Sequence, residues 1–163
     1  MQVLMMRRLS IRYALLVGVL LFTASVVDVR SAADLGYRPN SNPADRLSAA
    51  QSVAVDEDKK ILIIAGGDWC TWCHILNRFL SDNGDVDAAL HDAFEVVKVY
   101  VGEDTKNEEF FARLPRAVGY PHFWVLSKKG EVLESINTAT LENGQDTYRK
   151  DAFMAFIETY AAR

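Results

Sequence analysis

The chain has 163 residues, half of them hydrophobic, and this length and composition suffice for one domain with one buried core. Its 18 basic and 22 acidic residues leave a formal net charge of −4. Proteins that bind nucleic acids need a basic patch or stripe, so this charge balance argues against a nucleic-acid partner.

The first 33 residues have the pattern of a secretory signal peptide. Three arginines precede an uncharged and mainly apolar stretch, residues 13–27. This stretch is shorter than the roughly 20 residues of a membrane-spanning helix, so we expect cleavage rather than a retained anchor. Small residues permit cleavage before Asp34, and residues 29–31 offer a competing register. We predict a periplasmic or otherwise exported protein, membrane-bound only if this segment is retained.

Export would change the net charge of the chain and the chemistry of its cysteines. Removal of residues 1–33 takes away four Arg and one Asp and leaves 14 basic against 21 acidic residues, so the formal charge becomes −7. No cysteine lies near the cleavage region, which argues against a lipid anchor. Disulfides form readily outside the cytosol, so an exported dithiol needs a redox partner that supplies or removes electrons.

The first half of the remaining chain contains a linker, two helices and a strand. Residues 34–43 carry glycine, asparagine and proline and are predicted to be a linker. Apolar positions three and four residues apart predict a helix over 44–60, and an apolar, β-branched run predicts a buried strand over 61–65. Two glycines end the strand. Helical spacing over 73–80 then predicts a helix with Cys70 near its first turn.

The second half alternates between helical and strand patterns. We predict helical turns at 85–92, a strand at 94–101, a short helix at 107–114, strands at 123–126 and 131–136, and an amphipathic helix at 148–160. The last two strands flank a Lys-Gly turn, which predicts an antiparallel hairpin. The phenylalanines of this domain and Trp124 are predicted to lie in the core or at its edge.

The most informative motif is WCTWCH, residues 69–74, which contains the only two cysteines of the chain. A disulfide between Cys70 and Cys73 would close a very small loop. Cross-link stabilisation depends on the loop entropy that the unfolded chain loses, so such a bond adds little to a fold of this size. The pair is therefore predicted to be a redox reagent rather than a structural brace.

The position of the motif assigns different roles to the two cysteines. Unpaired N–H groups and the positive end of the dipole favour a thiolate at a helix start, so Cys70 is the predicted nucleophile. Cys73 lies one turn further, is expected to be more enclosed, and is the predicted resolving cysteine. The direction of the reaction stays open, because CxxC proteins span about −270 to −120 mV.

Three further features of the sequence support the redox interpretation of the WCTWCH motif. ILIIAGG leads into WCTWC, the segment RAVGYPHFWVLSKKGEVL follows later, and Lys98 lies on the intervening strand. Together these features resemble the thioredoxin family over residues 44–163. The resemblance implies an α/β thioredoxin fold with a central mixed β-sheet flanked by helices. It also makes Pro121 the candidate for a cis-proline.

The resemblance implies a thiol:disulfide oxidoreductase that reduces or isomerises disulfides in exported proteins. It implies no metal and no cofactor other than the redox-active Cys70–Cys73 disulfide. If Pro121 is cis, Tyr120 and His122 would flank a substrate groove. The residues implied for substrate binding are Trp69, Trp72, Tyr120 and Pro121, the tryptophans and Tyr120 forming an exposed aromatic collar.

One position departs from the family. Many members carry a buried Asp or Glu six residues before the first cysteine, where this chain has Ile64. His74 and Lys98 are therefore candidates for proton transfer or for tuning the pKa of the thiols. A solvated His74 on the helix surface is the alternative.

Besides the oxidoreductase, two other functions stay open, a c-type haem protein and a non-catalytic binding module. Cys70, Cys73 and His74 also match CxxCH, the attachment motif of c-type haem, with Met154, His91 or His122 as the second axial ligand. A structural zinc site is weaker, since a second pair of ligands is missing. The third hypothesis is a non-catalytic binding module with a thioredoxin fold, in which the dithiol has no role.

Overall fold

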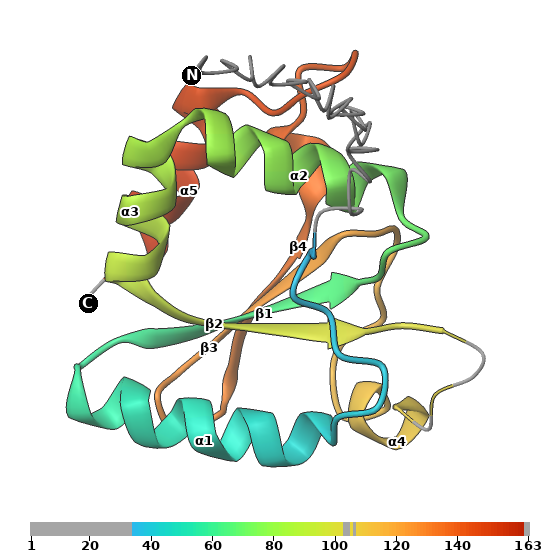
Figure 1. Cartoon of the computed structure of the whole chain (residues 1–163). Coiled ribbons are helices and arrows are strands. Elements are labelled where there is room, and N and C mark those ends of the chain that lie inside the picture. The colour runs from blue at the N-terminus through green and yellow to red at the C-terminus, as the bar shows by residue number, and fades with distance from the viewer. Residues whose placement is uncertain (1–33, 103–104, 106, 162–163) are drawn as a thin grey trace, which may run out of the picture. The chain divides into compact units, whose positions relative to one another are not determined.

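The computed structural model of this chain describes residues 34–102, 105 and 107–161, which form an α/β fold (Figure 1). The strands within these residues are β1 (Lys60–Gly66), β2 (Phe94–Tyr100), β3 (His122–Leu126) and β4 (Val132–Asn137). The helices are α1 (Pro43–Asp56), α2 (Thr71–Asp82), α3 (Gly84–Ala93), α4 (Glu108–Phe111) and α5 (Lys150–Tyr160), with a 3-10 helix, η1 (Thr138–Leu141). The predicted elements are present in the predicted order, and η1 is an addition.

The predicted signal peptide or anchor, residues 1–33, lies outside the described residues. In the part of the chain that the structure describes, no helix has both the length and the apolar character needed to cross a membrane. The prediction of export therefore depends on the sequence alone.

The strands form one mixed sheet in the order β2-β1-β3-β4. β1 is parallel to β2 and antiparallel to β3, and β3 is antiparallel to β4. Parallel strands need a crossover connection, which α2 and α3 provide between β1 and β2. The β3–β4 turn includes Gly130, whose φ of +88° is in the left-handed region that favours glycine. The predicted mixed sheet and hairpin are confirmed.

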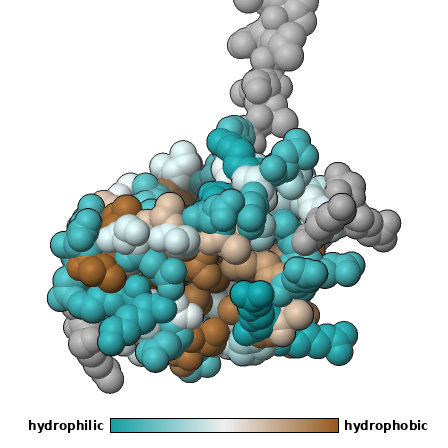
Figure 2. Space-filling model, turned by 90° about the horizontal axis from the view of Figure 1, so that it is seen from below, coloured by the Kyte–Doolittle hydropathy of each residue, from teal (hydrophilic) through white to brown (hydrophobic). Residues whose placement is uncertain are grey.

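Helices cover both faces of this sheet, α2, α3 and α5 on one face and α1 and α4 on the other (Figure 1). Successive side chains of a strand point to opposite faces. Leu62 and Ile64 of β1 accordingly join the core cluster under α2, α3 and α5, whereas Ile61, Ile63 and Ala65 join the cluster against α1. Seen from the side of α1 and α4, the surface is mainly hydrophilic, with hydrophobic residues exposed near its middle (Figure 2).

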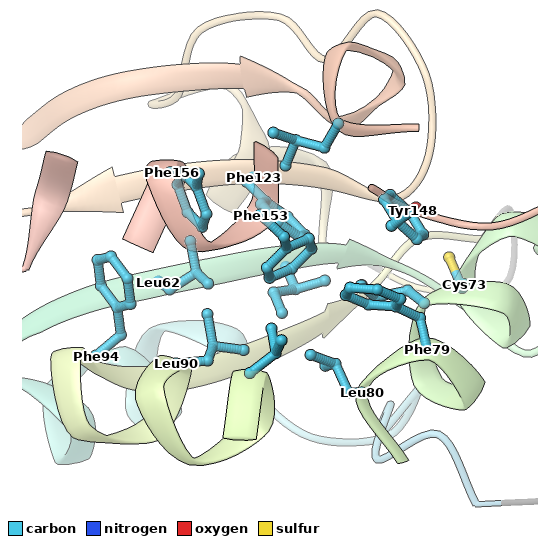
Figure 3. Close-up of a cluster of buried hydrophobic side chains, with 14 of the residues drawn as sticks. Leu62, Cys73, Phe79, Leu80, Leu90, Phe94, Phe123, Tyr148, Phe153 and Phe156 are labelled. Carbon is cyan, nitrogen blue, oxygen red and sulfur yellow. The ribbon is translucent and has the colours of Figure 1, made fainter. Parts of the chain in front are cut away.

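The cluster under α2, α3 and α5 is built around aromatic rings. Phe153 of α5 is fully buried and contacts Phe79 at 5.2 Å and Phe156 at 5.8 Å between ring centroids. Cys73 lies at one end of this cluster, on the side of Phe79 and Tyr148 (Figure 3). The cysteine pair is therefore part of the main core rather than of an independent loop.

α1 is shorter than the helix predicted over 44–60. Its start is fixed by Asn42, whose side-chain oxygen accepts the Ala44 N–H over 2.9 Å, and by Pro43 in the first turn. It ends at Asp56, because Asp58 takes a φ of 54° and turns the chain into β1. The apolar periodicity predicted the helix but carried no signal for this turn.

Residues 34–42, most of the predicted linker, have no regular secondary structure but pack on the domain. Leu35 and Tyr37 are only 1% and 4% exposed. Lys98 Nζ donates a hydrogen bond to the Leu35 carbonyl over 2.7 Å. The composition predicts the irregular backbone, but the folded unit includes residues before the predicted boundary at 44.

Candidate active site

Cys70 occupies the N-cap position of α2, directly after the loop that leaves β1. Its Sγ accepts the backbone N–H of Cys73 over 3.1 Å, and its carbonyl accepts the N–H groups of Cys73 and His74. Backbone N–H groups and the positive end of a helix dipole stabilise a thiolate at this position. Cys70 is therefore placed as a nucleophile requires.

Cys70 and Cys73 are joined by a disulfide, with their Cα atoms 5.2 Å apart. Cys70 is 4% exposed and Cys73 3% exposed. The sequence predicts that Cys73 is the more enclosed residue, whereas in this disulfide form the two are buried to the same degree. What distinguishes them is the backbone, since Cys70 caps the helix and Cys73 lies within its first turn.

Pro121 lies at the same edge of the sheet as the cysteine loop. The Tyr120–Pro121 peptide bond is cis, as predicted. β3 runs antiparallel to β1 with His122 opposite Ala65, so Pro121 comes level with the end of β1. Thr138 Oγ1 donates a hydrogen bond to the Pro121 carbonyl over 2.6 Å, which fixes this loop against η1.

Trp69 and Tyr120 form an aromatic pair at the surface. Their rings pack edge to face with centroids 5.6 Å apart, and they are 54% and 37% exposed. Trp69 Nε1 also donates to the Val101 carbonyl over 2.6 Å. The pair connects the cysteine loop to the cis-proline loop and leaves apolar surface beside the disulfide.

Two cavities of about 630 and 710 Å³ adjoin this pair. Trp69 lines the first and Tyr120 the second, and Val101, Glu108 and Phe111 line both. The cavities therefore give the Trp69–Tyr120 pair a largely apolar surrounding between β2, α4 and the loop before β3.

Trp72 differs from the predicted position at the surface. It is half-buried and packs edge to face on Tyr148, with ring centroids 5.6 Å apart. Because Trp72 lies in the first turn of α2, its ring contacts the core cluster instead of joining the Trp69–Tyr120 pair. The predicted collar of three aromatic residues is thus a pair at the surface and a third ring turned inward.

His74 and Lys98 both contact backbone carbonyls. The His74 ring nitrogen Nε2 lies 2.7 Å from the Asp68 carbonyl, which connects the first turn of α2 to the loop before Cys70. Lys98 lies opposite Ile64 in the β1–β2 pairing, and its Nζ is 5.9 Å from the centroid of the Tyr37 ring. Burial lowers the pKa of Lys98 below its usual value. A role of either residue in proton transfer stays a prediction.

Two tyrosines near the cysteines were not predicted. Tyr37 lies in the supposed linker, and Tyr148 precedes α5 and packs on both Trp72 and Phe79. Both are nearly fully buried, and burial raises the pKa of each above its usual value of 10. The alternation of Leu35 and Tyr37 around Gly36 is the one local sign in the sequence that this segment is packed.

His122 does not flank the groove as predicted. It is 2% exposed, its Nε2 lies 2.9 Å from Ser135 Oγ, and its ring packs on Trp124 with centroids 4.6 Å apart. As the first residue of β3, it points to the α1 side of the sheet, together with Trp124. Its ring is therefore not available to a substrate.

The residues of CxxCH do not fit a haem. A haem would need Cys70 and Cys73 as separate attachment points and His74 as an iron ligand. The two cysteines are instead bonded to each other and buried in the core, and the His74 ring contacts the Asp68 carbonyl. For metals, the described ranges contain no group of three or more His, Cys, Asp or Glu side chains placed to hold an ion.

Comparison with known proteins gives a family and two similar folds. A family model described as thioredoxin-like matches residues 42–128. The crystal structure of a disulphide isomerase from Xylella fastidiosa Temecula1 is 23% identical, with a TM-score of 0.64, covering 76% of this chain and 94% of that chain. The C-terminal domain of DsbD from Neisseria meningitidis, in its oxidised form, is 17% identical, with a TM-score of 0.55 and 74% and 97% coverage. No curated protein sequence matches the chain.

Proposed function

The chain belongs to the thioredoxin-like family, and on this basis we propose that it is a thiol:disulfide oxidoreductase acting through Cys70 and Cys73. The observation that carries the proposal is the position of Cys70 Sγ, which caps α2 and accepts a backbone N–H. The neighbouring cis-Pro121 loop and the exposed Trp69–Tyr120 pair support contact with a substrate there.

In the reduced protein, the Cys70 thiolate attacks one sulfur of a substrate disulfide. A bond forms between Cys70 Sγ and that sulfur, and the substrate S–S bond breaks. The second substrate sulfur leaves as a thiolate and takes up a proton. An extended segment of the substrate would pair with the backbone at Tyr120 and rest its side chains on the Trp69–Tyr120 pair.

Cys73 completes the reaction. Its thiol loses a proton and its sulfur attacks Cys70 Sγ, so that the mixed disulfide breaks and the substrate leaves as a thiol. Two electrons pass from the dithiol to the substrate, and the protein ends in the disulfide state. A dithiol donor must then reduce it again. This chemistry uses the protein's own sulfur atoms and needs no other cofactor.

We propose reduction or isomerisation of disulfides in exported proteins as the biological reaction. The arginines and the apolar stretch within residues 1–33 support export. The acidic charge of the remaining chain supports protein rather than nucleic-acid partners.

A redox titration tests the proposed activity. We expect Cys70 and Cys73 to convert reversibly between dithiol and disulfide in thiol buffers, with a two-electron midpoint between about −270 and −120 mV. A midpoint near the lower value indicates a reductase, and one near the upper value an oxidant. Cysteines that never titrate would overturn the proposal.

Trapping of substrates provides a second test with a matched control. Cys73→Ser should accumulate mixed disulfides with substrates through Cys70, because the resolving sulfur is missing. Cys70→Ser should trap far less. Equal partner capture by wild type, Cys70→Ser and Cys73→Ser through non-covalent contacts would instead indicate the binding module.

A further inference from the structure

The Tyr37 hydroxyl and the Cys73 sulfur border the same small space at the end of β1. A β-carbon placed on Gly66 would come closer than 3.0 Å to both Cys73 Sγ and Tyr37 Oη. Gly66 therefore leaves room that these two atoms share, and any larger residue would displace one of them. Tyr37 reaches this place from residues 34–42, far from the cysteines in sequence.

Tyr37 is held in this place by its own segment and by β2. The Leu35 carbonyl accepts a hydrogen bond from Lys98 Nζ over 2.7 Å, and the same ammonium group lies 5.9 Å from the centroid of the Tyr37 ring. Gly36 has a φ of +79°, and its N–H donates to Asp34 Oδ1 over 2.8 Å. The segment thus has specific contacts directly before Tyr37 and at its ring, and Tyr37 is 4% exposed.

A reduced Cys73 needs a polar partner in this environment. Its residue is 3% exposed and belongs to the hydrophobic cluster, so a thiolate there would be costly unless it accepted a hydrogen bond. On the basis of the proposed function, we propose that the Tyr37 hydroxyl donates a hydrogen bond to Cys73 Sγ when this sulfur becomes a thiolate. Tyr37 thereby becomes a catalytic residue of the resolving step.

The surroundings of Tyr37 fix its role as a donor. Burial, and then the nearby Tyr148 and Asp68, raise the pKa of Tyr37 above its usual value of 10. The hydroxyl therefore stays protonated at neutral pH and cannot take the Cys73 proton as a phenolate. Lys98 is also charged and lies near the Tyr37 ring, and its ammonium group donates a hydrogen bond to the Leu35 carbonyl.

The proton and electron balance of the step follows. The Cys73 thiol gives up its proton to solvent, and its sulfur attacks Cys70 Sγ in the mixed disulfide while Tyr37 keeps its own proton. The Cys70–substrate bond breaks, the Cys70–Cys73 bond forms, and the substrate thiolate takes up a proton. Hydrogen bonding to the developing thiolate lowers the barrier of this step and leaves the first attack by Cys70 unchanged.

The variant Tyr37→Phe tests this role because it removes the hydroxyl and keeps the ring. In a Cys70→Ser background, the ultraviolet absorbance of the Cys73 thiolate is followed against pH, so no reagent has to reach the buried sulfur. We expect Tyr37→Phe to move the midpoint upward by about one pH unit, a tenfold loss of thiolate. Tyr160→Phe, which removes a hydroxyl at the end of α5, should leave the midpoint unchanged.

Rapid-mixing kinetics with a disulfide-linked reporter peptide then separates the two chemical steps. In the protein with both cysteines, Tyr37→Phe should slow resolution of the mixed disulfide about threefold, because the higher nucleophilicity of the remaining thiolate partly offsets its tenfold loss, and should leave formation of the mixed disulfide unchanged. An unmoved Cys73 midpoint together with an unchanged resolution rate would overturn the inference, even if Tyr37→Phe lowered stability. A wild-type protein that never reacts with the reporter would overturn the proposed function instead, while the titration would still decide whether Tyr37 stabilises the thiolate.

Discussion

Trp69 and Trp72 lie on either side of Cys70 but in different surroundings. Trp69 is 54% exposed and packs on Tyr120, whereas Trp72 is half-buried against Tyr148. An exposed aromatic ring beside a reactive group offers apolar surface to a substrate, whereas a buried ring contributes to stability. The two tryptophans therefore form a matched pair for mutation.

We expect Trp69→Ala to raise the KM for a disulfide-linked peptide several-fold and to change the free energy of unfolding less than Trp72→Ala does. Trp72→Ala should lower the free energy of unfolding by about 2 kcal/mol, since it removes a half-buried ring. Steady-state kinetics and urea denaturation measure the two effects. If Trp69→Ala left KM unchanged, the surface pair would have no part in substrate binding.

His122 predicts a pH dependence of stability. Burial lowers its pKa in the folded protein below the usual value of 6.5. As the pH falls below 6.5, the unfolded chain takes up a proton at His122 before the folded chain does. The free energy of unfolding therefore decreases between pH 6.5 and the pKa of His122 in the folded protein, and this contribution is fully present above pH 6.5. We expect His122→Phe to remove this part of the acid-side loss in free energy of unfolding.

His91→Asn is the control for this prediction, because the His91 side chain is 57% exposed at the end of α3. Urea denaturation of the wild type and both variants at several pH values gives the comparison. The account of His122 fails if its variant and the His91 variant show the same dependence on pH as the wild type.

Residues that act through a local motif could be predicted from the sequence, and residues brought in from a distance could not. Cys70 has a local signal, a helix start after a strand, and cis-Pro121 was implied by the resemblance of its Tyr-Pro segment to the thioredoxin family. Tyr37 and Tyr148 reach the cysteines only because residues 34–42 pack beneath α2 and because the chain enters α5 beside it. Such contacts depend on packing between elements, which periodicity does not report.

At the scale of elements, the segment 34–42 is attached to β2 through one side chain. Lys98 Nζ donates to the Leu35 carbonyl, and Leu35 is 1% exposed, so water cannot readily replace that donor. The hydrogen bond therefore holds a segment that has no regular secondary structure of its own. Loss of this hydrogen bond should destabilise the segment more than it destabilises the sheet.

Lys98→Met tests this attachment. We expect faster hydrogen exchange of the amides at residues 35–38, about tenfold, with little change in β1, because the unpaired Leu35 carbonyl favours local opening. Lys150→Met is the control, since it breaks an exposed ion pair between the first turn of α5 and Asp85 in the first turn of α3 and leaves the segment intact. Exchange at residues 35–38 that does not respond to Lys98→Met would contradict the attachment.

At the scale of the whole molecule, the order of elements could be predicted because each strand and helix has its own period, whereas the mixed sheet was implied by the resemblance to the thioredoxin family. The ends of elements were less predictable. α1 stops at Asp56 because of the left-handed residue Asp58, and α4 (Glu108–Phe111) is half as long as the helix predicted over 107–114. Turns of this kind depend on single backbone angles, which apolar periodicity does not encode.

The two core clusters share the strands β1, β2 and β3, which predicts that they unfold together. Phe153 is fully buried and contacts Phe79, Phe123 and Phe156, so Phe153→Ala should lower the free energy of unfolding by about 3–5 kcal/mol. Trp124 lies on the opposite face of the sheet. In a background of Trp69→Phe and Trp72→Phe, where Trp124 is the remaining tryptophan, a cavity under α5 should nevertheless shift the transition seen by tryptophan fluorescence as much as the one seen by far-ultraviolet circular dichroism.

Val132→Ala provides the control, because Val132 is 38% exposed on β4 and its truncation should change stability by no more than about 0.5 kcal/mol. In Phe153→Ala, two transitions at different urea concentrations would mean that the faces of the sheet are separate folding units. Coincident transitions would mean that the strand carrying the chain into the cysteines is stabilised from both sides. The position of Cys70, after the loop that leaves β1, would then depend on residues as distant from it as Phe153 and Trp124.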